Sequence, residues 1–192
     1  KPWARRPEGY PAKPPVADAP PDKITPVFKT ETLPNGLKLI TIPNHEVPYL
    51  TAQLYLDAGT WAEDKPGTAN LALAMLSKGT AKRTEAQLSQ DLESEAMSLS
   101  ETATHDHCVL ELACLAEKSG DALAILAELV RTPTFPEDPF EKLRAQVRTG
   151  LAIEAKNPVK LAEREFRKRL YGAHPYARTT TGEIADLDAL AT

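Results

Sequence analysis

Apolar and polar residues alternate along several short stretches of the chain, and strict alternation predicts β-strands. Residues 50–57 read Leu-Thr-Ala-Gln-Leu-Tyr-Leu-Asp, which predicts a strand with one buried face and one solvated face. Residues 28–33 and 37–42 flank a Pro-Asn-Gly sequence, and Asn-Gly between two apolar runs is a strong signal for a β-hairpin. Residues 98–104 and 107–115 are expected to form a second pair of strands.

Helical stretches follow these strands, and capping residues and prolines mark their ends. Thr84 and Gln87 form a capping-box sequence that begins a helix running to about residue 95. Pro139 suits the first turn of a later helix, which Asn157-Pro158 ends. The expected helices cover residues 84–95, 121–130, 139–155 and 159–171. Because strands and then helices occur twice, we predict an α+β fold in which a mainly antiparallel β-sheet packs against helices.

Residues 67–80, with the sequence GTANLALAMLSKGT, form a further expected helix in which nearly every residue is apolar. Pro66-Gly67 precede this helix and Gly79 follows it. A helix with almost no polar face is expected to be buried on all sides. We therefore expect the side chains of residues 71–73, 75 and 76 to be mostly buried.

The composition narrows the class of protein. The 192 residues suffice for one domain, and 42% hydrophobic and 26% charged residues are ordinary for a globular protein. A net charge of −4 without a run of Lys and Arg argues against nucleic-acid binding. No stretch approaches the roughly 20 apolar residues of a membrane span. Lys1 opens a polar, proline-rich segment, so we expect no signal peptide in this chain.

Prolines and cysteines add two expectations. Residues 1–26 contain eight of the 17 prolines, which predicts a linker or tail, and we expect the folded domain to cover residues 27–192. Cys108 and Cys114 lie six residues apart in one predicted strand, so roughly 20 Å separates them, too far for a disulfide. We expect two buried free thiols on one strand face with Leu110 and Leu112.

Residues 67–80 resemble the zinc-site helix of the M16 (pitrilysin or insulinase-like) metallopeptidases, which has the frame G-T-A-H-x-x-E-H-M-L-x-K-G-T. Both ends of the frame are present, but Asn70, Leu73 and Ala74 stand where the family has His, Glu and His. Further segments resemble M16 sequences in the same order, namely residues 33–37, 57–60, 132–136 and 170–176. The resemblance runs from about residue 28 to the C-terminus and implies an M16 metallopeptidase-like (LuxS/MPP-like) domain.

The replaced positions matter because a catalytic zinc needs three imidazole, thiolate or carboxylate ligands beside its bound water. The resemblance places the third ligand, a glutamate in the family, at Gly150, and a one-residue slip in that alignment gives Leu151. Leu73, Ala74 and Gly150 have no donor atom, and the Asn70 amide is a poor zinc ligand. Asn70 is also open to interpretation as a helix-start residue that hydrogen-bonds to nearby backbone. We expect no catalytic residue, metal or cofactor in this chain.

The pattern resembles the non-catalytic copies of the family, in which an inactive half pairs with an active, zinc-bearing half or subunit. The pair encloses a chamber that holds a peptide. The resemblance implies the first domain of an inactive half, truncated at its C-terminus, with zinc in the active partner only. Similarity to fused bacterial forms suggests the periplasm or cell envelope. Two alternatives are a purely structural subunit, like the core proteins of respiratory complexes, and an active zinc endopeptidase with unusual ligands.

Three polar features lie outside this helix. His105 and His107 would share a strand face, so a surface metal site is conceivable, but no third donor is placed beside them and a solvated turn is the stronger interpretation. His174 is interpreted as a loop-positioning residue rather than a catalytic base. The last predicted helix is expected to carry an exposed, salt-bridged face made of Lys160, Glu163, Arg164, Glu165, Arg167, Lys168 and Arg169.

Overall fold

The computed structural model describes residues 26–190, which belong to two units, residues 1–47 and residues 48–192. In the first unit, β1 (Lys29–Thr32) and β2 (Lys38–Thr41) pair as an antiparallel hairpin. Gly36 has φ of 86° in the turn, a value that glycine adopts readily, and this confirms the hairpin prediction. The predicted linker of residues 1–26 lies outside the described residues except for Pro26.

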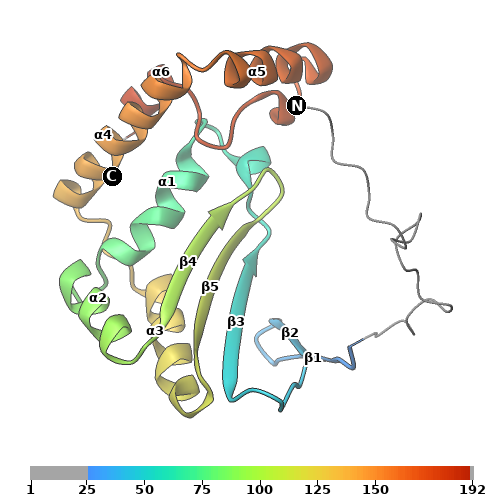
Figure 1. The fold of residues 1–192 in the computed structure, drawn as a ribbon, viewed down its shortest axis with the longest axis vertical. Coiled ribbons are helices and arrows are strands. Elements are labelled where there is room, and N and C mark those ends of the chain that lie inside the picture. The colour runs from blue at the N-terminus through green and yellow to red at the C-terminus, as the bar shows by residue number, and fades with distance from the viewer. Residues whose placement is uncertain (1–25, 191–192) are drawn as a thin grey trace, which may run out of the picture. The chain divides into compact units, whose positions relative to one another are not determined.

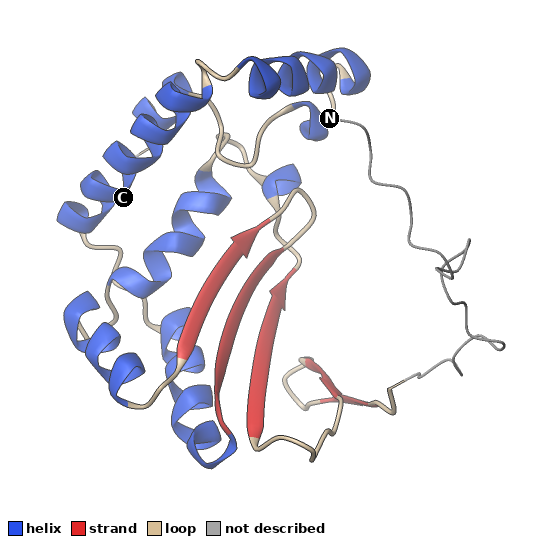
Figure 2. Ribbon diagram, in the orientation of Figure 1, coloured by secondary structure: helices blue, strands red, loops and turns tan. Residues whose placement is uncertain are grey.

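The second unit contains a three-stranded antiparallel sheet, shown in red in Figure 2. Its strands are β3 (Tyr49–Leu56), β4 (Ser98–Ala103) and β5 (Cys108–Leu115), in the spatial order β3-β5-β4. Along β3 exposed residues alternate with half-buried ones, as the sequence predicted. On β5 the side chains of Cys108, Leu110, Leu112 and Cys114 are buried on one face, and both cysteines are free thiols.

Residues 48–190 contain six α-helices, and the first three of them pack against one side of the sheet (Figure 1). The six helices are α1 (Thr68–Met75), α2 (Glu85–Ser94), α3 (Ser119–Arg131), α4 (Glu137–Glu154), α5 (Pro158–Tyr171) and α6 (Ile184–Asp188), with short 3-10 turns at Thr60–Ala62, Leu76–Lys78, Ala116–Lys118 and Pro175–Ala177. The capping box of Thr84 and Gln87 is present, and the Asn157 side chain caps α5. The α+β prediction is confirmed. The sequence did not predict α6. Among the described residues, no helix is long and apolar enough to cross a membrane.

Helix α1 lies between two hydrophobic clusters. Leu73 and Leu76 belong to a sheet-side cluster, and Leu71 and Met75 belong to a helix-side cluster. The other buried members of the sheet-side cluster are Leu88, Met97, Cys108, Leu110, Leu112, Cys114, Ala122, Ile125, Leu126 and Leu129. The helix-side cluster is completed by Phe140 and Leu151 of α4, Leu187 of α6, and Leu190. Side chains at successive 100° steps around α1 therefore enter both clusters.

A buried polar network fixes the chain just after α1. The backbone N–H groups of Lys82 and Arg83 donate to the Thr80 hydroxyl at 3.1 and 2.9 Å, and that hydroxyl donates to the Glu128 carboxylate on α3. Arg83 forms an ion pair with Glu128 and a second one with Asp91 of α2, at 2.7 Å. Glu128 is only 8% exposed, so its charge depends on these two partners.

We predict that Glu128→Ala lowers the free energy of unfolding by about 1–3 kcal/mol, because it removes one ion-pair partner of Arg83 and leaves the Thr80 hydroxyl only the Arg83 carbonyl, at 3.4 Å, as acceptor. Urea unfolding followed by circular dichroism measures this change. Asp91→Ala is the matched control, because it removes the other partner of Arg83 where the carboxylate is half exposed, and should cost less than about 1 kcal/mol. Equal losses in the two variants would contradict the importance of the buried network.

Candidate functional site

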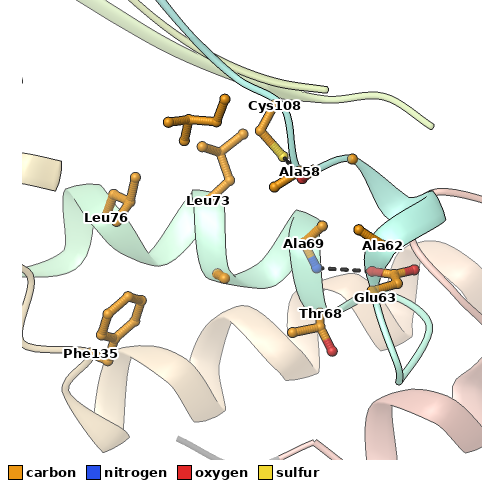
Figure 3. Close-up of a pocket in the computed structure, with 12 residues that line it drawn as sticks. Ala58, Ala62, Glu63, Thr68, Ala69, Leu73, Leu76, Cys108 and Phe135 are labelled. Atoms are coloured by element: carbon orange, nitrogen blue, oxygen red, sulfur yellow. Dashed lines mark hydrogen bonds between the residues drawn. The ribbon is translucent and has the colours of Figure 1, made fainter. Parts of the chain in front are cut away.

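The start of α1 is fixed by a carboxylate that precedes it. The backbone N–H groups of Gly67 and Ala69 each donate to a different oxygen of Glu63, both at 3.0 Å. Figure 3 shows the bond from Ala69. A carboxylate at this end of a helix also interacts favourably with the helix dipole. Glu63 therefore provides the hydrogen bonds to the helix start that we had considered for Asn70. The Asn70 side chain forms no hydrogen bond among residues 26–190. An acidic residue shortly before the helix was the available signal.

Glycine is required at the N-cap of α1 for two reasons. Gly67 has φ of 89°, in the left-handed region that side chains with a Cβ rarely adopt. A Cβ there would lie 2.8 Å from the carbonyl oxygen of Thr181, which belongs to the loop before α6. The two loops meet reciprocally, because a Cβ at Gly182 would lie 2.8 Å from the carbonyl oxygen of Pro66.

The three α1 positions that the resemblance aligns with a zinc site, Asn70, Leu73 and Ala74, differ in burial. Leu73 is 5% exposed and packs in the sheet-side cluster, whereas Asn70 and Ala74 are half-buried. The expected burial of Leu71, Leu73, Met75 and Leu76 is confirmed. The prediction that α1 is buried on all sides is wrong, because Thr68 is exposed and Ala72 is half-buried. The helix lies between two clusters, and one strip of it faces recesses that neither cluster fills.

Gly150, which the resemblance aligns with the third ligand, lies within α4 and is exposed. A Cβ built at this glycine would meet nothing within 4 Å, so a larger side chain has room there. The next residue, Leu151, is 5% exposed and shares the helix-side cluster with Leu71 and Met75. Among the described residues, no group of three or more His, Cys, Asp or Glu side chains is placed to hold a metal ion.

An apolar recess of about 310 Å³ adjoins α1 on the side of the sheet (Figure 3). Its walls are Leu56, Ala58, Gly59, Ala62, Glu63, Thr68, Ala69, Ala72, Leu73, Leu76, Cys108 and Phe135. The polar side chains in this wall already have partners: Glu63 caps α1, Thr68 donates to the Lys65 carbonyl at 2.7 Å, and the Cys108 thiol donates to the Ala58 carbonyl at 3.2 Å. Burial, with a smaller effect from the Glu63 charge, raises the pKa of the Cys108 thiol. The recess is therefore suited to an apolar group.

Phe135 separates this recess from a second apolar one of about 180 Å³. Thr68, Ala72 and Phe135 line both recesses, and the second also involves the helix-side residues Leu71, Met75, Phe140 and Leu190. Phe135 has φ of 45°, which is unusual for a bulky residue. The segment before it is held by a hydrogen bond of 3.1 Å from the Thr134 N–H to the Gly79 carbonyl. Residues 132–136 had been recognised as the end of the predicted helix 121–130 and as an M16-like segment, but this backbone conformation had not been predicted.

His105 and His174 form hydrogen bonds to loop backbone, and His107 packs beside an aromatic ring. His105 Nε2 lies 3.0 Å from the Arg178 carbonyl, while the His107 ring lies 5.5 Å from that of Tyr55, so the two rings have separate partners. The Tyr176 N–H donates to His174 Nδ1 at 3.2 Å, which confirms His174 as a loop-positioning residue. The Tyr176 hydroxyl donates to the Asp106 carboxylate, and this bond raises the pKa of Tyr176.

Comparison with known proteins identifies similar sequences across most of the chain. Residues 38–183 match the model of the insulinase family, peptidase family M16. An uncharacterized zinc protease of Rickettsia bellii is 26% identical over 160 residues, which cover 81% of this chain and 38% of that protein. The non-peptidase homolog YmxG of Helicobacter pylori is 27% identical over 141 residues, which cover 72% of this chain and 33% of that protein.

Solved structures show the same fold. A crystal structure described as the inactive domain of an M16 peptidase from Pseudomonas fluorescens is 32% identical and has a TM-score of 0.82, covering 86% of this chain and 41% of the other. A protease from Helicobacter pylori has a TM-score of 0.80 at 19% identity, with the same two coverages. This chain thus spans about two fifths or less of the length of these similar proteins.

We predict that Leu73→Ala lowers the free energy of unfolding by about 2–5 kcal/mol, because it enlarges a recess within the sheet-side cluster. Thermal and urea unfolding provide the measurement. Leu123→Ala makes the same change on α3, where the side chain is 49% exposed, and should cost much less. A Leu73→Ala variant as stable as the Leu123→Ala variant would show that position 73 is not part of the core.

Proposed function

Because this chain belongs to the M16 family of insulinase-type peptidases, we propose that it is a non-catalytic member of the family. In this proposal it pairs with an active, zinc-bearing M16 half or subunit and helps to form the chamber that holds the peptide. Its similarity to the M16 inactive domain from Pseudomonas fluorescens and to the non-peptidase homolog of Helicobacter pylori supports the non-catalytic assignment.

The burial of Leu73 is the observation that carries this proposal. A catalytic base must reach a water molecule on the metal, so its side chain has to face an open, hydrated space. Leu73 instead packs in the sheet-side cluster at 5% exposure, and the recess that it borders has apolar walls. A carboxylate at this position would be an unpaired charge buried among leucines, which costs free energy.

The donor atoms also fail to fit zinc. Of Asn70, Leu73, Ala74 and Gly150, only the asparagine offers a donor, and a neutral amide oxygen is not a typical zinc ligand. A stable catalytic zinc needs three stronger ligands. We therefore propose that any zinc in the assembly is bound by the partner.

The surface of the second unit supports pairing with another protein. Ile153 at the end of α4 and Val159, Phe166 and Leu170 on α5 are all more than half exposed, between 58% and 71%. Apolar side chains gathered on neighbouring helical turns are typical of surfaces that another protein covers. The apolar recesses beside α1 support the holding of peptide side chains, because their polar groups already have partners.

Co-expression with the M16 chain that carries an intact H-x-x-E-H motif in the same genome tests the proposed function. We expect the two chains to co-purify and peptidase activity to require both. Replacing the motif glutamate of the partner by glutamine should abolish activity, whereas Asn70→Ala in this chain should leave it unchanged. Zinc-dependent cleavage by this chain alone would refute the proposal. A complex whose activity does not depend on this chain would favour the purely structural alternative.

Rebuilding the ligands tests the proposed correspondence of positions. We expect Asn70→His, Leu73→Glu, Ala74→His and Gly150→Glu together to bind zinc with about micromolar or weaker affinity in calorimetry, with a lowered melting temperature. Peptidase activity should remain absent or weak, because the groups that would orient the new ligands are missing.

Two matched variants sharpen this experiment. Placing the second histidine at Ala72 instead of Ala74 moves it to another side of α1, so zinc affinity should be lost. Placing the glutamate at Leu151 instead of Gly150 tests the one-residue slip, and it should also disrupt the helix-side cluster. A folded fourfold variant without zinc affinity would show that the four positions do not converge.

A further inference from the structure

A charged recess of about 280 Å³ lies between α5 and the loop of residues 179–181. Helix α5 contributes Lys160, Glu163, Arg164 and Arg167, which recur at helical spacing along one side. The end of α4 contributes Glu154, the turn between β4 and β5 contributes His105, and the loop contributes Thr179, Thr180 and Thr181. The predicted exposed, salt-bridged face of α5 is confirmed by the ion pairs of Glu163 with Lys160 and Arg167, and the same charges also line this concave recess.

The positive charges in this recess are only partly compensated. Glu163 is shared by Lys160 and Arg167, at 3.5 and 3.7 Å, which are long distances for ion pairs. Glu154 is exposed and forms no ion pair within residues 26–190. Arg164 is half-buried, and no carboxylate of the described chain lies within 4.0 Å of its guanidinium group. Three cationic side chains therefore face two carboxylates, and neither carboxylate pairs with Arg164.

Arg164 also lines a neighbouring recess of about 420 Å³, which contains further charges. There the Glu183 carboxylate accepts from Lys168 at 3.0 Å, and that bond, with a smaller contribution from Arg164, lowers the pKa of Glu183. Arg178 and Asp186 complete the charged lining. Because Glu183 is already bonded to Lys168, the guanidinium of Arg164 keeps free donors between the two recesses.

The threonine loop adds hydroxyl donors on a fixed backbone. Thr180 and Thr181 are half-buried, and their hydroxyls have no partner among the described residues. The Thr179 hydroxyl donates to the Gly182 carbonyl at 2.9 Å, and His105 Nε2 holds the Arg178 carbonyl at 3.0 Å. These bonds, and the close approach of Gly182 to Pro66, fix the loop opposite α5 before any ligand arrives.

We propose that this recess binds a compact oxyanion, a phosphate or carboxylate group, with Arg164 as its main ligand. A planar guanidinium with free N–H groups binds such groups through two parallel hydrogen bonds, and threonine hydroxyls supply further donors. Lys160 and Arg167 add positive potential at the same recess, while Glu154 and Glu163 oppose it. None of the residues that line this recess is Asn70, Leu73, Ala74 or Gly150, so oxyanion binding by the purified chain does not depend on whether the chain is non-catalytic.

Titration of the purified chain at low ionic strength with two kinds of probe tests this proposal. Inorganic phosphate is one probe, and a short peptide with a free C-terminal carboxylate, compared with its amide, is the other. We expect saturable binding of at least one oxyanion probe, and the probe that binds identifies the source of the group. Binding should weaken with added salt, since a partly exposed charge pair is screened.

Variants of α5 and the loop locate the site. Arg164→Ala should weaken binding about tenfold or more, and Arg164→Lys should weaken it less, because lysine keeps the charge but loses the paired hydrogen bonds. Arg169→Ala is the matched control on the same helix, since Arg169 lines neither recess, and should change affinity less than about twofold. Thr180→Val tests the loop without altering any charge. Absence of saturable binding, or equal loss in the Arg164→Ala and Arg169→Ala variants, would overturn the proposal.

Discussion

The placement of α1 between two hydrophobic clusters is the constraint on which the second unit depends. Leu73 and Leu76 on one side of the helix join it to the sheet and α3, while Leu71 and Met75 join it to α4 and α6. Burial of each such side chain contributes about 1.5–3 kcal/mol, and both clusters lose their common wall if the helix moves. The helix is therefore held in position and orientation by packing on both sides, independently of any metal.

The residues that flank α1 also hold it in place through contacts with distant segments. Gly67 permits the close approach of the loop before α6, and a Cβ at Gly79 would lie 3.0 Å from the Thr134 hydroxyl. Thr80 connects the end of the helix to Glu128. Each of these residues has a structural task in the present fold. Leu73 lies between these residues and packs in the sheet-side cluster. A leucine at this position therefore stabilises the fold more than a buried charged side chain would.

The recesses of the second unit differ in what they can bind. Beside α1 the polar groups of Glu63, Thr68 and Cys108 already have partners, which leaves apolar walls divided by Phe135. Beside α5, by contrast, the Arg164 guanidinium and the Thr180 and Thr181 hydroxyls have donors without a partner among the described residues. The second unit thus presents two distinct kinds of recess, one with apolar walls and one lined by charged and hydroxyl groups.

Neighbouring residues and side-chain types were enough to predict the local structure and the donor atoms available at positions 70, 73, 74 and 150. The hairpin around Asn35-Gly36 and the helix start at Thr84 depend on neighbouring residues, so turn and capping rules predicted them. That Leu73, Ala74 and Gly150 carry no donor atom, and that Asn70 carries only a neutral amide, follows from the side chains themselves.

Which side of each helix or strand is buried, and which side lines a recess, depends on the tertiary structure. The network of Thr80 and Glu128 joins residues 48 apart, and the left-handed backbone of Phe135 is held by a hydrogen bond between Thr134 and Gly79. The charges of α5 line a recess only because a loop from beyond that helix folds back against it. Such features depend on contacts between distant segments, and local propensity carries no information about these contacts.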